Sequence, residues 1–322
     1  MATFGIQPTR RAVLTGVLSI AASSAIAKAP LSNAQVAGVH RFKIGTAEIV
    51  AILDGYFDLN TELMPKASTE TVQEIQRAHF MPTGKTVRSA INTYIVNTGN
   101  NLTLIDTGAR DYLGPTVGKF PANLAAAGYS PEQVDRIILT HMHPDHIGGV
   151  IDTSGARVFP NATMHANEGD WSFWRDPQMK AKADAVNASF FDIAKSSSDA
   201  YEDRAELYKF GRDLGDGITA LDMSGHTPGH SGLVIESNGS SLFILGDVVH
   251  SAPLQFTHPE WGIAFDVDQE AAIKARMRSL DMAATDRVMI AGMHIPFPGI
   301  GYVEKRGKGY QFIPAPWQYV IE

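Results

Sequence analysis

Beyond about its fortieth residue, the chain alternates between apolar and polar positions, which is the pattern of half-buried β-strands. Residues 42–44 and 47–53 predict one hairpin, and residues 91–96 and 102–105 predict a second. The strands of the second hairpin flank Asn97-Thr98-Gly99-Asn100-Asn101, a run of turn-forming residues. This part of the chain is therefore expected to form antiparallel β-structure.

Helical spacing of apolar residues follows further along the chain. It predicts a helix in 115–127, which Pro121 starts or interrupts, and a clear amphipathic helix in 269–284. Residues 168–210 are expected to be mostly helical, the segment 200–210 included, because alanine, lysine and acidic residues are frequent there.

Apolar segments that predict strands lie between and after these helices, with approximate bounds 136–140, 218–223, 231–236, 241–245 and 287–291, and a final hairpin around 306–309. Each half of the chain thus has the order hairpins, helix, strand. This order predicts an α/β (α+β) protein in which two mixed sheets pack together with helices outside.

The first 29 residues have the composition of an export signal. Thr9-Arg10-Arg11 carries paired arginines, small and apolar residues follow, and an A-x-A pattern predicts cleavage after Ala27 or Ala29. The paired arginines resemble the twin-arginine type of bacterial signal, so we expect a periplasmic or secreted protein. An uncleaved anchor helix is the alternative. Residues 30–322 are expected to form a single domain.

Composition limits the chemistry. Of 322 residues, 44% are hydrophobic and 19% are charged, which is ordinary for a globular protein with a sizeable core. The chain has no cysteine, which excludes disulfides, thiolate metal sites, iron–sulfur clusters and cysteine nucleophiles. Its formal net charge is -7 and it holds no run of lysine or arginine, which disfavours nucleic acid and anionic membranes as partners.

Three histidines and an aspartate lie within six positions directly after the predicted strand 136–140, namely His141, His143, Asp145 and His146. Imidazole and carboxylate are the usual ligands of zinc and similar divalent ions. Four such side chains at the end of a buried strand are difficult to explain by packing. They predict a metal-dependent enzyme.

Three later stretches share this arrangement, with a metal-capable side chain and a glycine just beyond an apolar strand. They are Gly225-His226-Thr227-Pro228-Gly229-His230, Gly246-Asp247 and Gly292-Met293-His294. Strand ends of this kind can meet at one edge of a sandwich, so these side chains are expected to converge.

The order of these motifs resembles the metallo-β-lactamase superfamily, with H-x-H-x-D-H at 141–146, then G-H-T-P-G-H, then G-D and a late histidine. Leu104-Ile105-Asp106-Thr107-Gly108 matches its early strand and turn. The resemblance covers essentially the whole mature chain and implies an αββα sandwich with a two-metal site at one edge. Shorter segments resemble the branch of methyl parathion hydrolase and quorum-quenching lactonases; they are 114–116, 127–129, 159–161, 297–301 and 307–310.

The resemblance also implies the site. Seven side chains would hold two metal ions: His141, His143 and His226 the first, Asp145, His146 and His294 the second, and Asp247 both. Zinc is the default, and manganese, iron or cobalt also suit nitrogen and oxygen ligands. A hydroxide bridging the two ions would attack the substrate, and the ions would stabilise the developing charge. Asp145 and Asp247 are the expected catalytic carboxylates, with Asp145 taking up a proton.

Three further polar residues lie near the predicted ligands. Asp106 is expected to hydrogen-bond a ligand imidazole, with a turn cap as the alternative. His230 either orients its loop or is an ordinary local histidine. His250, three positions after Asp247, could reach the site, although a rim or structural role is favoured.

Substrate choice is expected to come from a pocket wall. Trp174 and Phe190 correspond to aromatic wall positions of the family, and Leu113 stands where the organophosphate hydrolases carry phenylalanine. A place in the core is the alternative for the two aromatic residues. The leucine disfavours aryl phosphotriesters as main substrates.

The expected function is hydrolysis of lactones or esters, acyl-homoserine lactones included, with phosphotriesterase activity as a side reaction. A dedicated organophosphate hydrolase is the first alternative. A β-lactamase fits less well, because many such enzymes have a late cysteine ligand. An iron-dependent sulfur dioxygenase, a flavodiiron-type reductase and a non-enzymatic binding protein complete the alternatives. The expected partner is a small molecule, and a homodimer is compatible with the long segment before Arg88, which has no evident role at the site.

Overall fold

The structure is a computed structural model that describes residues 31–321. The predicted export signal in residues 1–29 therefore lies outside the described residues. The chain divides into two units, residues 1–36 and residues 37–322. In the first unit, the described residues 31–36 form no helix or strand. No helix within 31–321 has both the length and the apolar character that a bilayer span requires.

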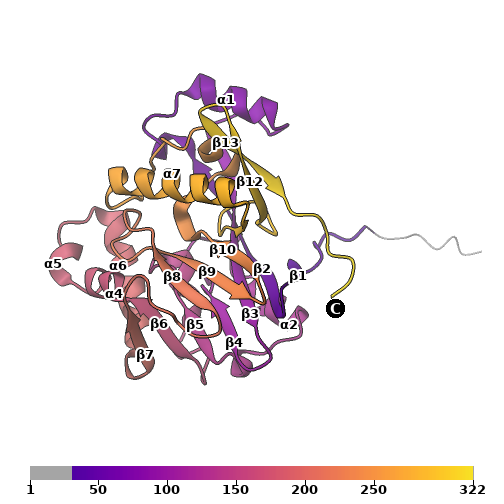
Figure 1. The fold of residues 1–322 in the computed structure, drawn as a ribbon. Coiled ribbons are helices and arrows are strands. Elements are labelled where there is room, and N and C mark those ends of the chain that lie inside the picture. Colours follow the sequence, from indigo (N-terminus) through magenta and orange to yellow (C-terminus); the bar gives the residue numbers. More distant parts are fainter. Residues whose placement is uncertain (1–30, 322) are drawn as a thin grey trace, which may run out of the picture. The chain divides into compact units, whose positions relative to one another are not determined.

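The second unit contains two mixed sheets (Figure 1). The first sheet has seven strands in chain order: β1 Val39–Ile44, β2 Ala47–Asn60, β3 Thr86–Asn97, β4 Leu102–Ile105, β5 Arg136–Ile138, β6 Thr163–Asn167 and β7 Ala205–Tyr208. Neighbours from β1 to β4 pair antiparallel, and neighbours from β4 to β7 pair in parallel. Both predicted hairpins, β1–β2 and β3–β4, are confirmed.

The second sheet has six strands in the order β13-β12-β11-β10-β9-β8. Their bounds are β8 Ile218–Asp222, β9 Ser231–Ser237, β10 Ser240–Ile244, β11 Met289–Ala291, β12 Ile300–Arg306 and β13 Gly309–Pro314. Only β10 and β11 pair in parallel in this sheet. The strands expected in this half of the chain are confirmed to within one or two residues.

Helices cover the outer faces of both sheets (Figure 1). Their bounds are α1 Thr69–Ala78, α2 Phe120–Ala126, α3 Pro144–Ile147, α4 Glu168–Trp174, α5 Pro177–Lys180, α6 Ala185–Asp199 and α7 Gln269–Asp286. Residues of α2, α4 and α6 share a hydrophobic cluster with the first sheet, and residues of α7 share one with the second. A third cluster, which includes Ile49, Tyr94, Leu233 and Leu242, joins the two sheets. The predicted αββα architecture is confirmed.

Two sequence predictions need correction. The segment 200–210 was expected to be helical, but Ala205–Tyr208 is strand β7, which pairs in parallel with β6. The helix expected in 115–127 begins only at Phe120, because the preceding loop bonds to the Asp54 carboxylate instead. In both cases contacts with distant segments outweigh local helix propensity.

The topology brings the predicted ligands to one edge. Strands β4, β5 and β6 are parallel, so their carboxyl ends lie at the same edge of the first sheet. His141 follows β5 in that direction, while Asp247 and His294 follow the parallel pair β10 and β11. His226 lies on the connection between β8 and β9.

Candidate metal centre

The connection between β5 and α3 presents four of the predicted ligands. His143 is the extended residue before α3, with φ of -69° and ψ of 158°. Pro144 then begins the helix, where its fixed φ is favourable and its missing N–H costs nothing. Asp145 and His146 follow within the single helical turn. The change from extended to helical backbone at His143 separates the two pairs of ligands.

Three imidazole nitrogens converge in the first part of the cluster. Nδ1 of His143 lies 3.0 Å from Nε2 of His141 and 2.9 Å from Nε2 of His226. Oδ2 of Asp247 is 3.7 Å from the His141 nitrogen and 3.5 Å from the His226 nitrogen. These four side chains can offer their ligand atoms to one cation.

The second part of the cluster shares the same aspartate. Oδ2 of Asp145 lies 3.6 Å from Nε2 of His146 and 3.4 Å from Nε2 of His294. Asp247 approaches these two imidazoles through both oxygens, with Oδ1 at 3.2 Å from His146 and Oδ2 at 3.0 Å from His294. Asp247 thus lies close to the imidazoles of both parts of the cluster, which is the position of a carboxylate that can bridge two cations.

The chemistry of this cluster fits divalent metal ions. Nε2 of His146 and Oδ1 of Asp247 are buried and have no hydrogen-bond partner in the described part of the chain. Buried polar atoms in proteins are normally satisfied, so such orphaned atoms facing each other indicate a missing partner. Nitrogen and oxygen ligands at these spacings suit zinc and its neighbours in the first transition row.

The electrostatics agree with this fit. Burial, together with the neighbouring imidazoles, lowers the pKa of His141 and His143 well below the usual value, so both rings are neutral at pH 7. Burial also acts to lower the pKa of His226, but the carboxylates of Asp247 and Asp266 raise it to about 9. A cation in the cluster would take the place of that proton.

The cluster opens into a chamber of about 170 Å³. Its lining combines ligand side chains with the apolar residues Phe57, Leu113, Phe190 and Phe265. Trp174 is only 2% exposed and does not line this chamber. It lines a neighbouring cavity of about 290 Å³ instead.

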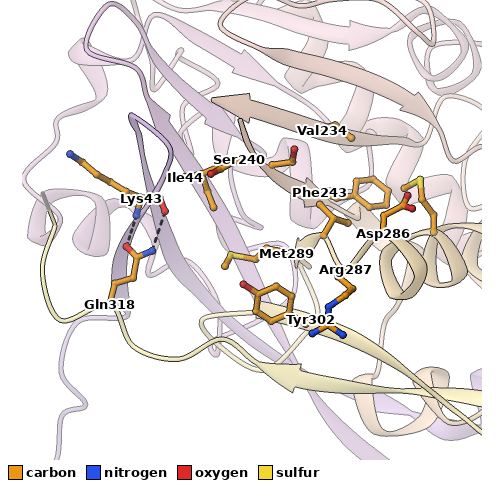
Figure 2. Close-up of a pocket in the computed structure, with 13 residues that line it drawn as sticks. Lys43, Ile44, Val234, Ser240, Phe243, Asp286, Arg287, Met289, Tyr302 and Gln318 are labelled. Carbon is orange, nitrogen blue, oxygen red and sulfur yellow. Dashed lines mark hydrogen bonds between the residues drawn. The ribbon is translucent and has the colours of Figure 1, made fainter. Parts of the chain in front are cut away.

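A separate cavity of about 630 Å³ lies away from the cluster (Figure 2). Ser240 and Met289, which begin β10 and β11, line it together with Arg287 and Tyr302. It is thus found at the opposite ends of the two strands that lead to Asp247 and His294. No predicted site residue lines this cavity.

Comparison with known proteins identifies the family. Residues 86–294 match Lactamase_B, the metallo-beta-lactamase superfamily. The chain belongs to the metallo-β-lactamase superfamily. The matched region runs from β3 to the last predicted ligand, His294, and so spans every predicted metal ligand.

Solved structures of the superfamily are similar over most of the chain. A structure described as hydrolase AbOPH in the beta lactamase superfamily is 37% identical, with a TM-score of 0.83, and covers 88% of this chain and 100% of its own. AidC, described as a dizinc quorum-quenching lactonase, is 27% identical, with a TM-score of 0.81 and the same coverage. The protein is therefore a metal-dependent hydrolase of this superfamily.

A curated relative gives a weaker match. The atrochrysone carboxyl ACP thioesterase of Passalora fulva is 25% identical over 167 residues, which are 52% of this chain and 40% of that protein. The chain thus spans less than half the length of this relative.

Asp106 and His230 both contact ligands of the superfamily motif. Oδ2 of Asp106 accepts a hydrogen bond of 2.7 Å from Nδ1 of His146, as expected from the sequence. His230 donates from Nδ1 to the Met223 carbonyl and accepts at Nε2 from the backbone N–H of Asp247, at 2.8 Å. Burial lowers the pKa of His230 to about 3, so the ring is neutral and keeps this acceptor. Of the two alternatives for His230, the geometry supports the one in which it orients a loop.

Two buried aspartates near the superfamily motif were not found by sequence reasoning. Oδ1 of Asp266 lies 2.9 Å from Nδ1 of His226. Oδ2 of Asp170 accepts from the backbone N–H of Met142 and from the Thr227 hydroxyl, each at 2.9 Å. The separations are 40, 28 and 57 positions, so no local pattern could have indicated these pairs.

His250 lies closer to the cluster than the sequence suggested. It is 2% exposed, its Nε2 is 3.3 Å from Oδ2 of Asp247, and it lines the chamber. Both of its ring nitrogens are without a hydrogen-bond partner in residues 31–321. It also forms a third group of metal-capable side chains with Asp247 and His294. Of the alternatives for His250, the geometry therefore favours the one in which it reaches the site over a place on the rim.

Proposed function

We propose that the protein hydrolyses uncharged lactones and esters at a dinuclear metal centre built from the seven clustered side chains. One observation carries this proposal: the chamber next to the cluster is lined by aromatic and aliphatic residues, and no lysine or arginine is present among the described residues of its lining. Away from the metal ions, an anionic substituent on the substrate would find no cationic side chain in this lining to pair with its charge. An uncharged lactone or ester needs no such partner.

Two divalent ions held by these side chains would supply a water of lowered pKa and would polarise the reacting carbonyl. His141, His143 and His226 would hold one ion, Asp145, His146 and His294 the other, and Asp247 both. Asp145 has 12% of its side chain exposed and lines the chamber, so its free oxygen can accept a proton during attack. Burial lowers the pKa of His250 to about 4, so its neutral ring can donate one hydrogen bond to a substrate oxygen.

We place the protein in the branch of methyl parathion hydrolase and quorum-quenching lactonases. Its 37% identity with AbOPH and 27% identity with the lactonase AidC support this assignment. A phosphotriester is also uncharged, so a secondary phosphotriesterase activity fits the same chamber. Leu113 and Phe190 line the chamber and would contact the substrate, whereas Trp174 would act from the neighbouring cavity.

The decisive experiment compares rates on a homoserine lactone, dihydrocoumarin, an aryl ester and a phosphotriester, with the metal content of each preparation measured. We expect the lactones or the ester to be hydrolysed fastest and two ions to be bound per chain. His143→Ala and Asp247→Ala proteins, shown to be folded by circular dichroism, should lose at least about a hundredfold in rate. Exposed Asp286→Asn serves as the control.

Full activity in folded His143→Ala and Asp247→Ala proteins would disprove the dinuclear mechanism. Turnover of methyl paraoxon far above that of any lactone would favour a dedicated organophosphate hydrolase. One iron ion per chain without hydrolysis would favour a sulfur dioxygenase. The paired arginines at positions 10 and 11 support the separate proposal of export to the periplasm, which cell fractionation tests.

A further inference from the structure

Asp54 occupies an irregularity in strand β2. Leu53 pairs with Asn92 on β3 and Gly55 pairs with the adjacent Ile91, so Asp54 is an extra residue with no partner on that strand. Such a β-bulge redirects a side chain out of the regular alternation. The Asp54 carboxylate is fully buried. A buried carboxylate needs hydrogen-bond donors, and these come from one loop.

The loop between β4 and α2 supplies those donors from both of its ends. At one end the backbone N–H of Ala109 donates to Oδ2 of Asp54 at 2.9 Å. At the other end Gly118 donates to the same oxygen at 3.3 Å and Phe120 to Oδ1 at 2.9 Å. The N–H of Lys119 also donates to the Asp54 carbonyl at 2.9 Å. One residue therefore clamps the two ends of residues 109–120 together.

The fit of the clamp leaves no room for side chains at two glycines. A Cβ on Gly108 would stand 2.6 Å from Cγ of Asp54, and a Cβ on Gly118 would stand 2.4 Å from the Arg110 carbonyl oxygen. Both glycines have positive φ, at 78° and 80°, a conformation that other residues adopt at a cost. The close approach of Gly118 to Arg110 shows that the loop ends lie side by side.

Leu113 lies between the clamped ends and lines the chamber beside the metal cluster. A second cavity of about 430 Å³ borders the same loop and is lined by Arg110, Asp111, Gly114 and Pro115, among others. Leu113 packs against a small buried cluster of Ile91, Ala109 and Val117. Apart from the Asp54 bonds, the Thr116 hydroxyl donates to the Tyr56 carbonyl at 2.6 Å and adds a further tie to β2.

We propose that Asp54 is a positioning residue that holds Leu113 against the chamber and so sets the size of ester that the enzyme accepts. This inference rests on the proposed function. Asp54 acts through the loop and contacts no predicted metal ligand by hydrogen bond. Its loss should therefore change substrate selection more than the chemical step.

The test compares Asp54→Asn with wild type on a short-chain and a long-chain acyl-homoserine lactone. An asparagine keeps the shape of the side chain, but it replaces one acceptor oxygen by an amide NH2 group, which cannot accept from the backbone N–H donors. We expect KM for the long-chain substrate to change by about tenfold, with kcat within about threefold and KM for the short-chain substrate nearly unchanged. Metal content should stay the same. Asp58→Asn is the matched control, because Asp58 is exposed on the same strand and pairs with Arg88.

Hydrogen exchange gives a readout that does not depend on catalysis. Amides in 109–120 should exchange at least about ten times faster in Asp54→Asn, while amides of β5 and β10 keep their protection. In a Leu113→Ala background, Asp54→Asn should no longer alter discrimination between the two lactones. Gly118→Ala disturbs the same clamp from the loop side and should reproduce the change in discrimination if Asp54→Asn does not fold.

Equal losses on both lactones with loss of metal would show a merely structural role and would overturn the inference. Unchanged exchange in 109–120 would overturn it as well. If the wild type hydrolyses neither lactone but cleaves aryl esters, a short-chain and a long-chain aryl ester replace the lactones in the same comparison. If it cleaves no lactone and no ester, the proposed function fails, and the size-selection inference fails with it. The exchange measurement then still decides separately whether Asp54 holds the loop.

Discussion

Nδ1 of His226 lies 2.9 Å from Oδ1 of Asp266, a residue 40 positions further along the chain. The other oxygen of Asp266 accepts from the backbone N–H of Ile263 at 3.0 Å, so the carboxylate is fixed on both sides. A carboxylate on the outer nitrogen of a metal-binding imidazole fixes its tautomer and orientation. Asp106 and His146 repeat the arrangement at 2.7 Å in the other half of the cluster.

Asp266→Asn is expected to weaken zinc binding by about 10- to 100-fold, because a neutral amide has only one acceptor oxygen for two donors, Nδ1 of His226 and the N–H of Ile263. Competition with a chromogenic chelator measures the affinity. Asp286→Asn, an exposed change at the end of α7, should leave the affinity as in wild type. Equal affinity in the Asp266→Asn protein would show that the pair does not orient the ring.

Asp170 connects two ligand segments and should contribute to both stability and metal binding. Its carboxylate accepts from Met142 in the first segment and from Thr227 and Gly229 in the second. Asp170→Ala leaves these buried donors unsatisfied, and we expect the free energy of unfolding to fall by about 1–3 kcal/mol per unsatisfied group. Urea unfolding of the metal-free protein measures this loss.

Asp192→Ala is the matched control for Asp170→Ala. Asp192 is exposed and forms a surface ion pair with Lys180. Surface ion pairs of this kind contribute little, so its effect should stay below about 1 kcal/mol. A similar small effect for Asp170→Ala would contradict the role of this carboxylate.

Metal removal should destabilise the protein, because the cluster binds cations only when it is folded. A free metal concentration of 100 times Kd stabilises the native state by about 2.7 kcal/mol. We therefore expect treatment with a chelator to lower the thermal midpoint and added zinc to restore it. His143→Ala should reduce the response to zinc. A midpoint unaffected by both treatments would argue against a metal centre.

Acid should destabilise the protein partly through His165, which lies on β6 outside the metal cluster. Burial lowers its pKa below the usual 6.5, against a weaker opposite effect of Glu206, whose carboxylate is 3.8 Å from Nδ1. Below about pH 6.5 the unfolded chain therefore binds a proton that the folded chain does not, and stability falls as the pH is lowered.

His165→Gln should reduce the loss of stability between about pH 7.5 and pH 5, measured as the shift of the urea midpoint. His79→Gln, at an exposed histidine after α1, should keep the acid sensitivity of the wild type. If both proteins lose as much stability as wild type, the effect belongs to other groups.

The sequence predicted most strands, because strand signals are local. Alternation defines β1 to β4, and a short apolar run defines β5. The same local reasoning missed β7, since its alanine and glutamate favour a helix and only pairing with β6 makes Ala205–Tyr208 a strand. It also gave no indication of α1, which lies in the segment before Arg88.

By itself, the sequence determined which side chains can bind metal, because residue types are read from it directly. It also determined that each of them follows a strand, because the spacing of apolar residues indicates the strands. The tertiary structure decided which groups hold those side chains. Asp266 reaches His226, Asp170 reaches Met142, and Asp54 reaches both ends of the Leu113 loop, 55 and 66 positions away. Hydrogen bonds act through space over about 3 Å, so only the packing of two sheets determines such partners.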